Sequence, residues 1–183
     1  MRGLPIIGAA VLAIATLSTA AGVHYAAPRQ AHGSQWQEIA WPFPRDGWPA
    51  GRAFRCDAAT CGTETELYVR PKIGFCNCDS GVADDDEVDR VADLDLISER
   101  FAPLAPGKPV RIAEMSGRLR NYHRDVSGGA RHAAIGIAVS HRCDLLVAVA
   151  EGEGGAGELQ RAALDFLGTH EIHHWMMAAL GGG

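Results

Sequence analysis

The sequence is poor in lysine and has no surplus of positive charge. Its 17 basic residues include only two lysines, Lys72 and Lys108, and 22 acidic residues outnumber them, which gives a net charge of −5. A protein that binds nucleic acid through the phosphates needs a basic face to meet them. We therefore expect no nucleic-acid partner, and we assign no site to the preference for arginine.

Several motifs that carry catalysis are also missing. The chain has no phosphate-binding glycine loop, no nucleophile elbow and no Cys-x-x-Cys redox motif. The serines that could act as nucleophiles stand in no recognisable catalytic context: Ser80, Ser98, Ser116, Ser127 and Ser140. The sequence thus favours a non-enzymatic protein over an enzyme.

The composition excludes disorder as the main state. Hydrophobic residues make up 47% of the chain and charged residues 21%, which is close to an ordinary globular protein. A chain of 183 residues is long enough for one domain with its own core and short for two. We predict a single α+β domain over residues 36–183, preceded by a polar linker at residues 27–35.

The N-terminal segment contains the one long apolar run. Arg2 is the only charged residue in residues 1–26, and residues 4–23 read LPIIGAAVLAIATLSTAAGV. A basic start, an apolar stretch and small residues around Ala20 are typical of a secretory signal, and about 20 apolar residues also suffice to span a bilayer. We predict that residues 1–26 are a signal peptide or, if uncleaved, an inner-membrane anchor. Either would place the domain in the periplasm or outside the cell.

Alternation and turn signals predict an antiparallel sheet. The expected strands cover residues 53–56, 65–69, 110–115, 118–124, 133–139 and 144–150. Helical spacing marks residues 84–97, 158–167 and 170–180. Residues 36–49 carry aromatic side chains among prolines and indicate an extended strap over the domain. This order predicts a sheet of five to six strands with helices packed on one face.

Five cysteines lie in the part of the chain predicted to be exported: Cys56, Cys61, Cys76, Cys78 and Cys143. Neighbouring thiols become disulfides in an oxidising compartment. Cys56 and Cys61 bracket a four-residue turn, and a bridge from Cys76 or Cys78 to Cys143 avoids the very small ring that a Cys76–Cys78 bridge would close. We predict one or two structural disulfides, and an odd count leaves at least one thiol over.

A metal site is the alternative use of the same cysteines. Thiolates of Cys56, Cys61, Cys76 and Cys78 could surround zinc or cuprous ion, which are the ions that soft sulfur ligands favour. A redox-active thiol is a further alternative.

Residues 170–174 read His-Glu-x-x-His, which resembles the zinc-peptidase pattern. On a helix, His170 and His174 lie one turn apart and could hold one zinc ion, with Glu171 activating its water. Only nine residues follow the motif, so the third ligand would have to come from upstream. The upstream candidates are acidic residues and the histidines His123, His132 and His141.

Four segments carry a family resemblance over most of residues 36–180: WPFPRDGWPAGRAFRC, YVRPKIGFCNC, GVADDDEVDRVADLDLI and HRCDLLVAV. In this order they resemble a family of small exported proteins of α-proteobacteria. No activity is established for that family, so the resemblance implies no catalytic residue. The order of strands and helices is also similar to the sheet-plus-helix arrangement of PsbP/Mog1-type folds, a likeness of topology that assigns no function.

Together these observations predict a non-enzymatic binding or assembly domain of the bacterial cell envelope. It would face the periplasm, secreted or held at the membrane by residues 4–23, with an envelope protein as a candidate partner. A metal-handling protein using the cysteines or His170 and His174 is the second hypothesis, and a zinc peptidase is the third.

Overall fold

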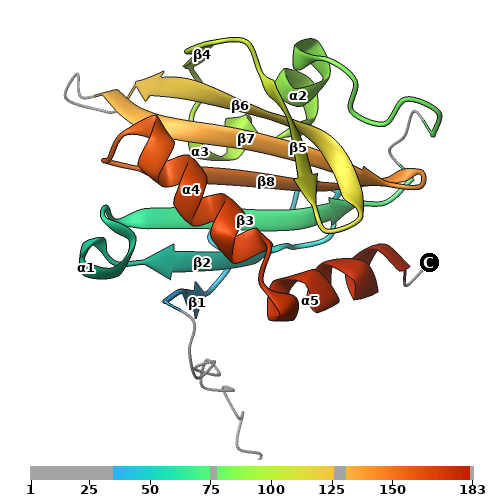
Figure 1. The fold of residues 1–183 in the computed structure, drawn as a ribbon, viewed down its shortest axis with the longest axis horizontal. Helices are drawn as coiled ribbons and strands as arrows, with labels where there is room; N and C mark the ends of the chain where they lie inside the picture. Colours follow the sequence, from blue (N-terminus) through green and yellow to red (C-terminus); the bar gives the residue numbers. More distant parts are fainter. Residues whose placement is uncertain (1–34, 75–77, 126–130, 182–183) are drawn as a thin grey trace, which may run out of the picture.

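The computed structural model describes residues 35–74, 78–125 and 131–181. The predicted signal or anchor segment, including residues 4–23, lies outside these ranges, as does Cys76. The described chain forms one sheet with helices on both sides (Figure 1). Its elements are β1 (Gln37–Ile39), β2 (Arg52–Cys56), α1 (Ala58–Cys61), β3 (Thr65–Lys72), α2 (Asp85–Val91), α3 (Leu94–Ile97), β4 (Phe101–Pro103), β5 (Lys108–Ile112), β6 (Met115–Asp125), β7 (Arg131–His141), β8 (Asp144–Gly152), α4 (Ala156–Leu167) and α5 (His170–Gly181).

The eight strands of the described chain pair antiparallel in the order β1-β2-β3-β8-β7-β6-β4, and β5 pairs with β6. The α+β class is confirmed, but the predicted count of five to six strands is wrong. The additional strands β1 and β4 have three residues each. A strand of three residues is too short to show alternation in the sequence, and β1 lies in residues 36–49, whose prolines predict an extended strap.

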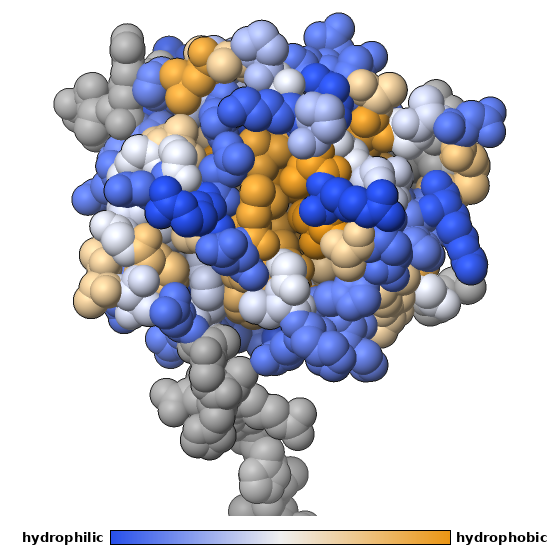
Figure 2. All heavy atoms as spheres, viewed as in Figure 1, coloured by the Kyte–Doolittle hydropathy of each residue, from blue (hydrophilic) through white to orange (hydrophobic). Residues whose placement is uncertain are grey.

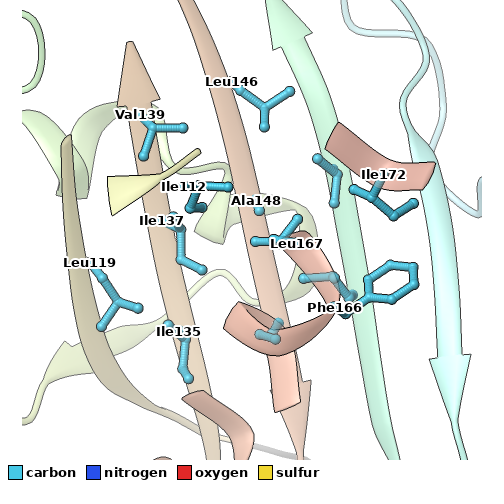
Figure 3. Packing of buried hydrophobic residues seen from close by; sticks show 14 of the residues in the cluster. Ile112, Leu119, Ile135, Ile137, Val139, Leu146, Ala148, Phe166, Leu167 and Ile172 are labelled. Carbon is cyan, nitrogen blue, oxygen red and sulfur yellow. The ribbon is translucent and has the colours of Figure 1, made fainter. Parts of the chain in front are cut away.

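The two central strands, β7 and β8, are apolar on both faces. Along β7, Ile135, Ile137 and Val139 belong to the core under α4 and α5 (Figure 3). Ala134 and Ala138 lie on the opposite face, in clusters with residues of α2 and α3. The prediction that helices pack on one face is therefore wrong, because a strand that is apolar on both faces must be covered on both.

The outer surface on the α4 and α5 side is mostly hydrophilic, with one apolar area near its centre (Figure 2). Val110 of β5 and Leu164 of α4 are only partly buried where they pack on the core. Apolar atoms make up a large part of the surface of any folded domain, so partly exposed apolar side chains of this kind are ordinary.

On the opposite face, two cations of β3 are buried in an ion-pair network. Arg70, which is 4% exposed, donates from Nε and Nη2 to the two oxygens of Asp93 at 2.6 and 2.9 Å. Lys72 Nζ lies 2.6 Å from the same carboxylate, and Asp46 of the strap lies 2.7 Å from Arg70 Nη2. Asp93 has a φ of 59°, and this left-handed residue divides the helix predicted over residues 84–97 into α2 and α3.

Replacing Asp93 by Asn should destabilise the fold. We expect Asp93→Asn to lower the free energy of unfolding by about 3–5 kcal/mol, because two buried cations lose the carboxylate that they share. Asparagine keeps the size of the side chain and tolerates the left-handed backbone. Asp95→Asn on the exposed side of α3 is the matched control, and equal losses in urea denaturation for the two variants would contradict this role of Asp93.

Candidate functional site

A pocket opens on the α2 and α3 side of the sheet, near the ends of four adjacent strands. Its volume is about 240 Å³. We call it the glutamate pocket, and it is lined by Glu64, Glu66, Arg124, His132, Glu151, Gly152 and Glu153. Side chains alternate between the faces of a strand, so Glu66 and Glu151 point to the same face as the buried Tyr68 and Val149 of that side.

The strand register explains how these residues meet. Glu66 of β3 and Glu151 of β8 are direct cross-strand partners. Across β7 and β6, Arg124 pairs with His132 in the same way. The residue of β7 opposite Glu151 is Ala134, whose small side chain lets Arg124 of β6 reach Glu151 of β8 across β7.

Three donors hold the two central carboxylates in place. The Tyr68 hydroxyl donates to Glu66 Oε2 and lies 3.5 Å from Glu151 Oε1, between the two groups. Arg55 donates to Glu66 from Nε at 2.9 Å, and Arg124 forms an ion pair with Glu151. The orientation of the two carboxylates is therefore set by side chains of β2, β3 and β6.

The environments of the two carboxylates push their pKa values apart. Burial raises the pKa of Glu151, and the charge of Arg124 opposes that rise only in part. Burial also acts to raise the pKa of Glu66, but hydrogen bonds from Tyr68 and Arg55 bring it below the ordinary glutamate value. Burial and the hydrogen bond to Glu66 raise the pKa of Tyr68, so its hydroxyl keeps its proton and acts as a donor.

The pocket is connected to the N-terminal strap through Tyr68. The rings of Trp41 and Phe43 pack edge-on against the Tyr68 ring, with centroids at 6.2 and 4.7 Å. Since Tyr68 donates to Glu66, this aromatic cluster supports one of the residues that line the pocket. Chemically, the pocket offers fixed carboxylate oxygens as acceptors, with one guanidinium and one imidazole beside them.

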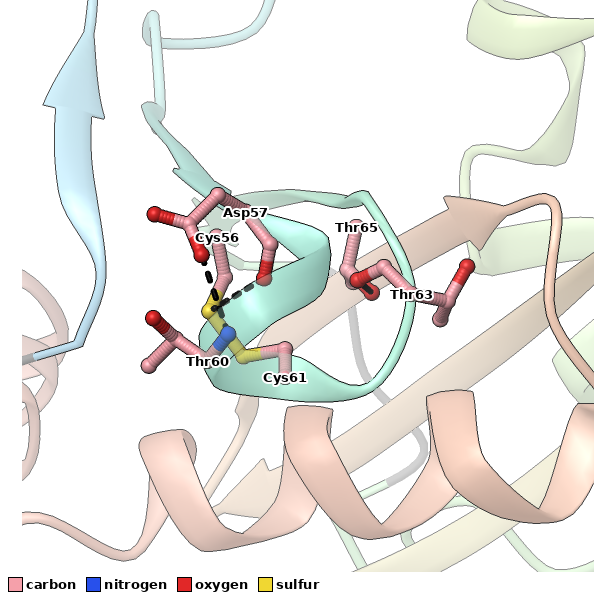
Figure 4. Close-up of a disulfide and its surroundings, with 6 residues drawn as sticks. All are labelled: Cys56, Asp57, Thr60, Cys61, Thr63 and Thr65. Carbon is pink, nitrogen blue, oxygen red and sulfur yellow. Dashed lines mark hydrogen bonds between the residues drawn. A yellow bond between two sulfur atoms is a disulfide. The ribbon is translucent and has the colours of Figure 1, made fainter.

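The described residues form two disulfides. Cys56 and Cys61 are joined, with their Cα atoms 6.0 Å apart (Figure 4). Between them the chain forms the single turn of α1, which begins at Asp57 with a side-chain bond to the Thr60 amide and ends at Gly62 with a φ of 81°. The turn predicted between these two cysteines is thus one turn of helix.

The second disulfide joins Cys78 to Cys143, with a Cα separation of 4.5 Å. It ties the segment before α2 to the turn between β7 and β8. The prediction of structural disulfides is confirmed for these four cysteines. A sulfur that forms a disulfide is not a thiolate, so while the bridges are intact these four sulfurs are not thiolate ligands for a metal ion. Two disulfides are typical of a domain stabilised for an oxidising, extracytoplasmic compartment.

The His-Glu-x-x-His residues lie at the start of α5. His170, Glu171 and His174 are exposed, and the two imidazole rings stack with centroids 6.5 Å apart. Ile172 is buried on the other side of the helix, and His173 Nε2 lies 2.8 Å from Glu114 Oε2. Within the described ranges, no three His, Cys, Asp or Glu side chains are grouped so as to hold a metal ion.

Two further findings bear on the class of protein. Among residues 35–74, 78–125 and 131–181, no helix has both the length and the apolar character needed to cross a membrane. No protein-family model matches the chain, and no curated protein matches it.

Sequence reasoning missed the glutamate pocket. Its signal was present as two Glu-x-Glu pairs, Glu64 with Glu66 and Glu151 with Glu153. Residues 151–157 contain four glycines, a composition that indicates a flexible loop, and this hid the fact that β8 continues to Gly152. Only the pairing of β3 with β8 brings the two pairs together.

Intact mass tests the disulfides. Alkylation before reduction should add one label and alkylation after reduction five, because two bridges hold four of the five cysteines. The same spectrum reports whether residues 1–26 are removed. Three or more labels before reduction would contradict the pairing, and peptide mapping identifies the partners.

The stability of the protein should depend on pH through Glu151. With its pKa raised in the folded state, Glu151 keeps its proton above about pH 4, where unfolded glutamate ionises. The folded state then binds more protons, so the free energy of unfolding falls as the pH rises through this window. Glu151→Gln removes the titration, and its stability relative to the native protein should increase from about pH 4 to 7.

The measurement is chemical denaturation at a series of pH values, with the exposed Glu158→Gln on α4 as the control. A stability difference between Glu151→Gln and the native protein that stays constant with pH would show that Glu151 titrates normally.

Proposed function

We propose that this protein is an exported, non-enzymatic binding domain of the bacterial cell envelope, and that the glutamate pocket holds its ligand. The domain would face the periplasm, either secreted or held at the inner membrane by residues 4–23 if that segment stays uncleaved. The observation that carries the proposal is the pocket itself, a cavity of about 240 Å³ with charged side chains from four adjacent strands.

The way the charged groups are held supports recognition. Ligand pockets combine a concave surface with a few polar groups in fixed positions. Here Tyr68, Arg55 and Arg124 fix the two central carboxylates before any ligand arrives. A preformed site of this kind loses little conformational freedom on binding.

The disulfides support the compartment. Bridges persist outside the cytoplasm and are reduced within it. The Cys56–Cys61 bridge closes the connection between β2 and β3. Arg55, near the end of β2, bonds the pocket residue Glu66, and Glu64, just before β3, lines the pocket. An oxidising compartment would therefore stabilise the part of the fold on which the proposed site depends.

Two experiments test the proposal, one for export and one for binding. The full chain is fused to a reporter that is active only outside the cytoplasm, and a signal is expected. The purified domain is then screened by thermal shift against amines, amino acids, sugars, organic acids and short peptides. A ligand should raise the melting temperature of the native protein but not of Glu153→Trp, in which an indole covers the exposed rim of the pocket.

Glu158→Trp places the same side chain at an exposed position on α4 and should respond like the native protein. A silent reporter would contradict export. A panel without any stabilising ligand, or one whose ligands act equally on Glu153→Trp, would contradict the assignment of the pocket.

A further inference from the structure

One face of α5 carries three side chains that can ligate a soft metal ion. His170, His174 and Met177 follow one another at intervals of four and three residues, and residues at this spacing share one face of a helix. The helix packs on the core through a separate set of buried side chains: Ile172, Met176 and Leu180. The three possible ligands therefore lie on a face of α5 that the core does not use.

The imidazoles of His170 and His174 are available to an ion. Both side chains are exposed, and neither forms a hydrogen bond or an ion pair with another described residue. Their rings already lie face to face, with centroids 6.5 Å apart and planes inclined by 29°. Two bonds of about 2 Å each, the usual length between a metal ion and imidazole, fit between rings at this separation. Exposed side chains can turn to aim a nitrogen at the ion without moving the helix.

His173 shows the contrast on the same helix. It lies next to His174 in the sequence, but its Nε2 is 2.8 Å from Glu114 Oε2. This contact ties His173 to the connection between β5 and β6. His170 and His174 have no comparable structural use among the described residues.

Met177 supplies a ligand of a different kind. It is only partly buried, whereas its neighbour Met176 lies in the core. Helical side chains lean toward the N-terminus of the helix, so Met177 extends toward the histidine three residues before it. An uncharged thioether sulfur is a soft ligand that favours cuprous ion, and imidazole also suits copper.

The same face does not fit a zinc peptidase. Zinc sites draw their ligands from Cys, His, Asp and Glu, and the described residues contain no group of three of these suited to a metal ion. Glu171, the candidate base, lies on the side of Arg52. The hydrogen bond with Glu38 raises the pKa of Arg52, and the nearby charge of Glu171 adds to that rise.

We infer that α5 carries a binding site for cuprous ion, formed by the imidazoles of His170 and His174 and the thioether of Met177. The site lies on the surface, which suits an ion that is taken up and released. It shares no residue with the glutamate pocket and goes beyond the binding function proposed for that pocket.

The test is an anaerobic titration of the purified protein with cuprous ion against bicinchoninate as the competing chelator. Every sample carries Cys76→Ser, because a free thiolate also binds this ion. We expect one cuprous ion per chain. In NMR spectra the methyl signal of Met177 should shift as the ion is added, and the signals of the buried Met115 and Met176 should stay in place. Zinc at the same concentration should leave the Met177 signal unchanged.

Three variants remove one ligand each: His170→Gln, His174→Gln and Met177→Leu. They should fold, because the histidines are exposed and leucine is close to methionine in volume. Each should weaken cuprous binding at least about tenfold, whereas His173→Gln on the same helix should leave it unchanged.

Absence of cuprous binding would overturn the inference, and so would equal weakening in His173→Gln. Binding that survives Met177→Leu would overturn it as well, because the thioether would then not be a ligand. The ligand screen of the glutamate pocket uses none of these residues, so its outcome is distinguishable from this one.

Discussion

The structure depends on one constraint, which is that the β7–β8 hairpin is apolar on both faces. Ile135 and Ile137 require one covering layer, and Ala134 and Ala138 require another. The chain meets the first need with α4 and α5 and the second with the strap, α2 and α3 (Figure 1). The small alanines on the second face admit short helices at close range.

The second face is held by ion pairs as well as by apolar contact, and arginine supplies three of the cations. Arginine presents a planar fork that bonds a carboxylate at two points, which lysine cannot do. Arg70 grips Asp93, Arg118 holds Asp85, and Arg120 reaches Asp89 on α2. Under the helices, the carboxylates of Asp85, Asp89 and Asp93 are each paired with an arginine. At the open end of the sheet the glutamates outnumber the arginines, and the pocket lies there.

How much of the structure the sequence predicts depends on how many residues each pattern spans along the chain. The long strands β7 and β8 and the helix α4 carry enough repeats of their period to be recognised, and the close spacing of Cys56 and Cys61 indicates their bridge. The short strands β1 and β4 carry too few residues for a period. The covering of the second face and the meeting of Glu66 with Glu151 are properties of strand pairing, which a linear pattern does not contain.

The same strand pairing holds the side chains of the pocket in fixed positions, although their negative charges would favour moving apart. Flexible glutamates would turn apart into water, where their mutual repulsion is screened. Here the Tyr68 hydroxyl donates to Glu66 beside Glu151, the strap aromatics hold Tyr68, and the Cys56–Cys61 bridge closes the connection that leads into β3. The fold relieves the repulsion between Glu66 and Glu151 by a different route, because burial raises the pKa of Glu151 and it keeps its proton at a pH where an unfolded glutamate has lost it. A ligand that meets such preformed groups loses little conformational freedom, because the fold has already supplied the order that binding would otherwise have to impose.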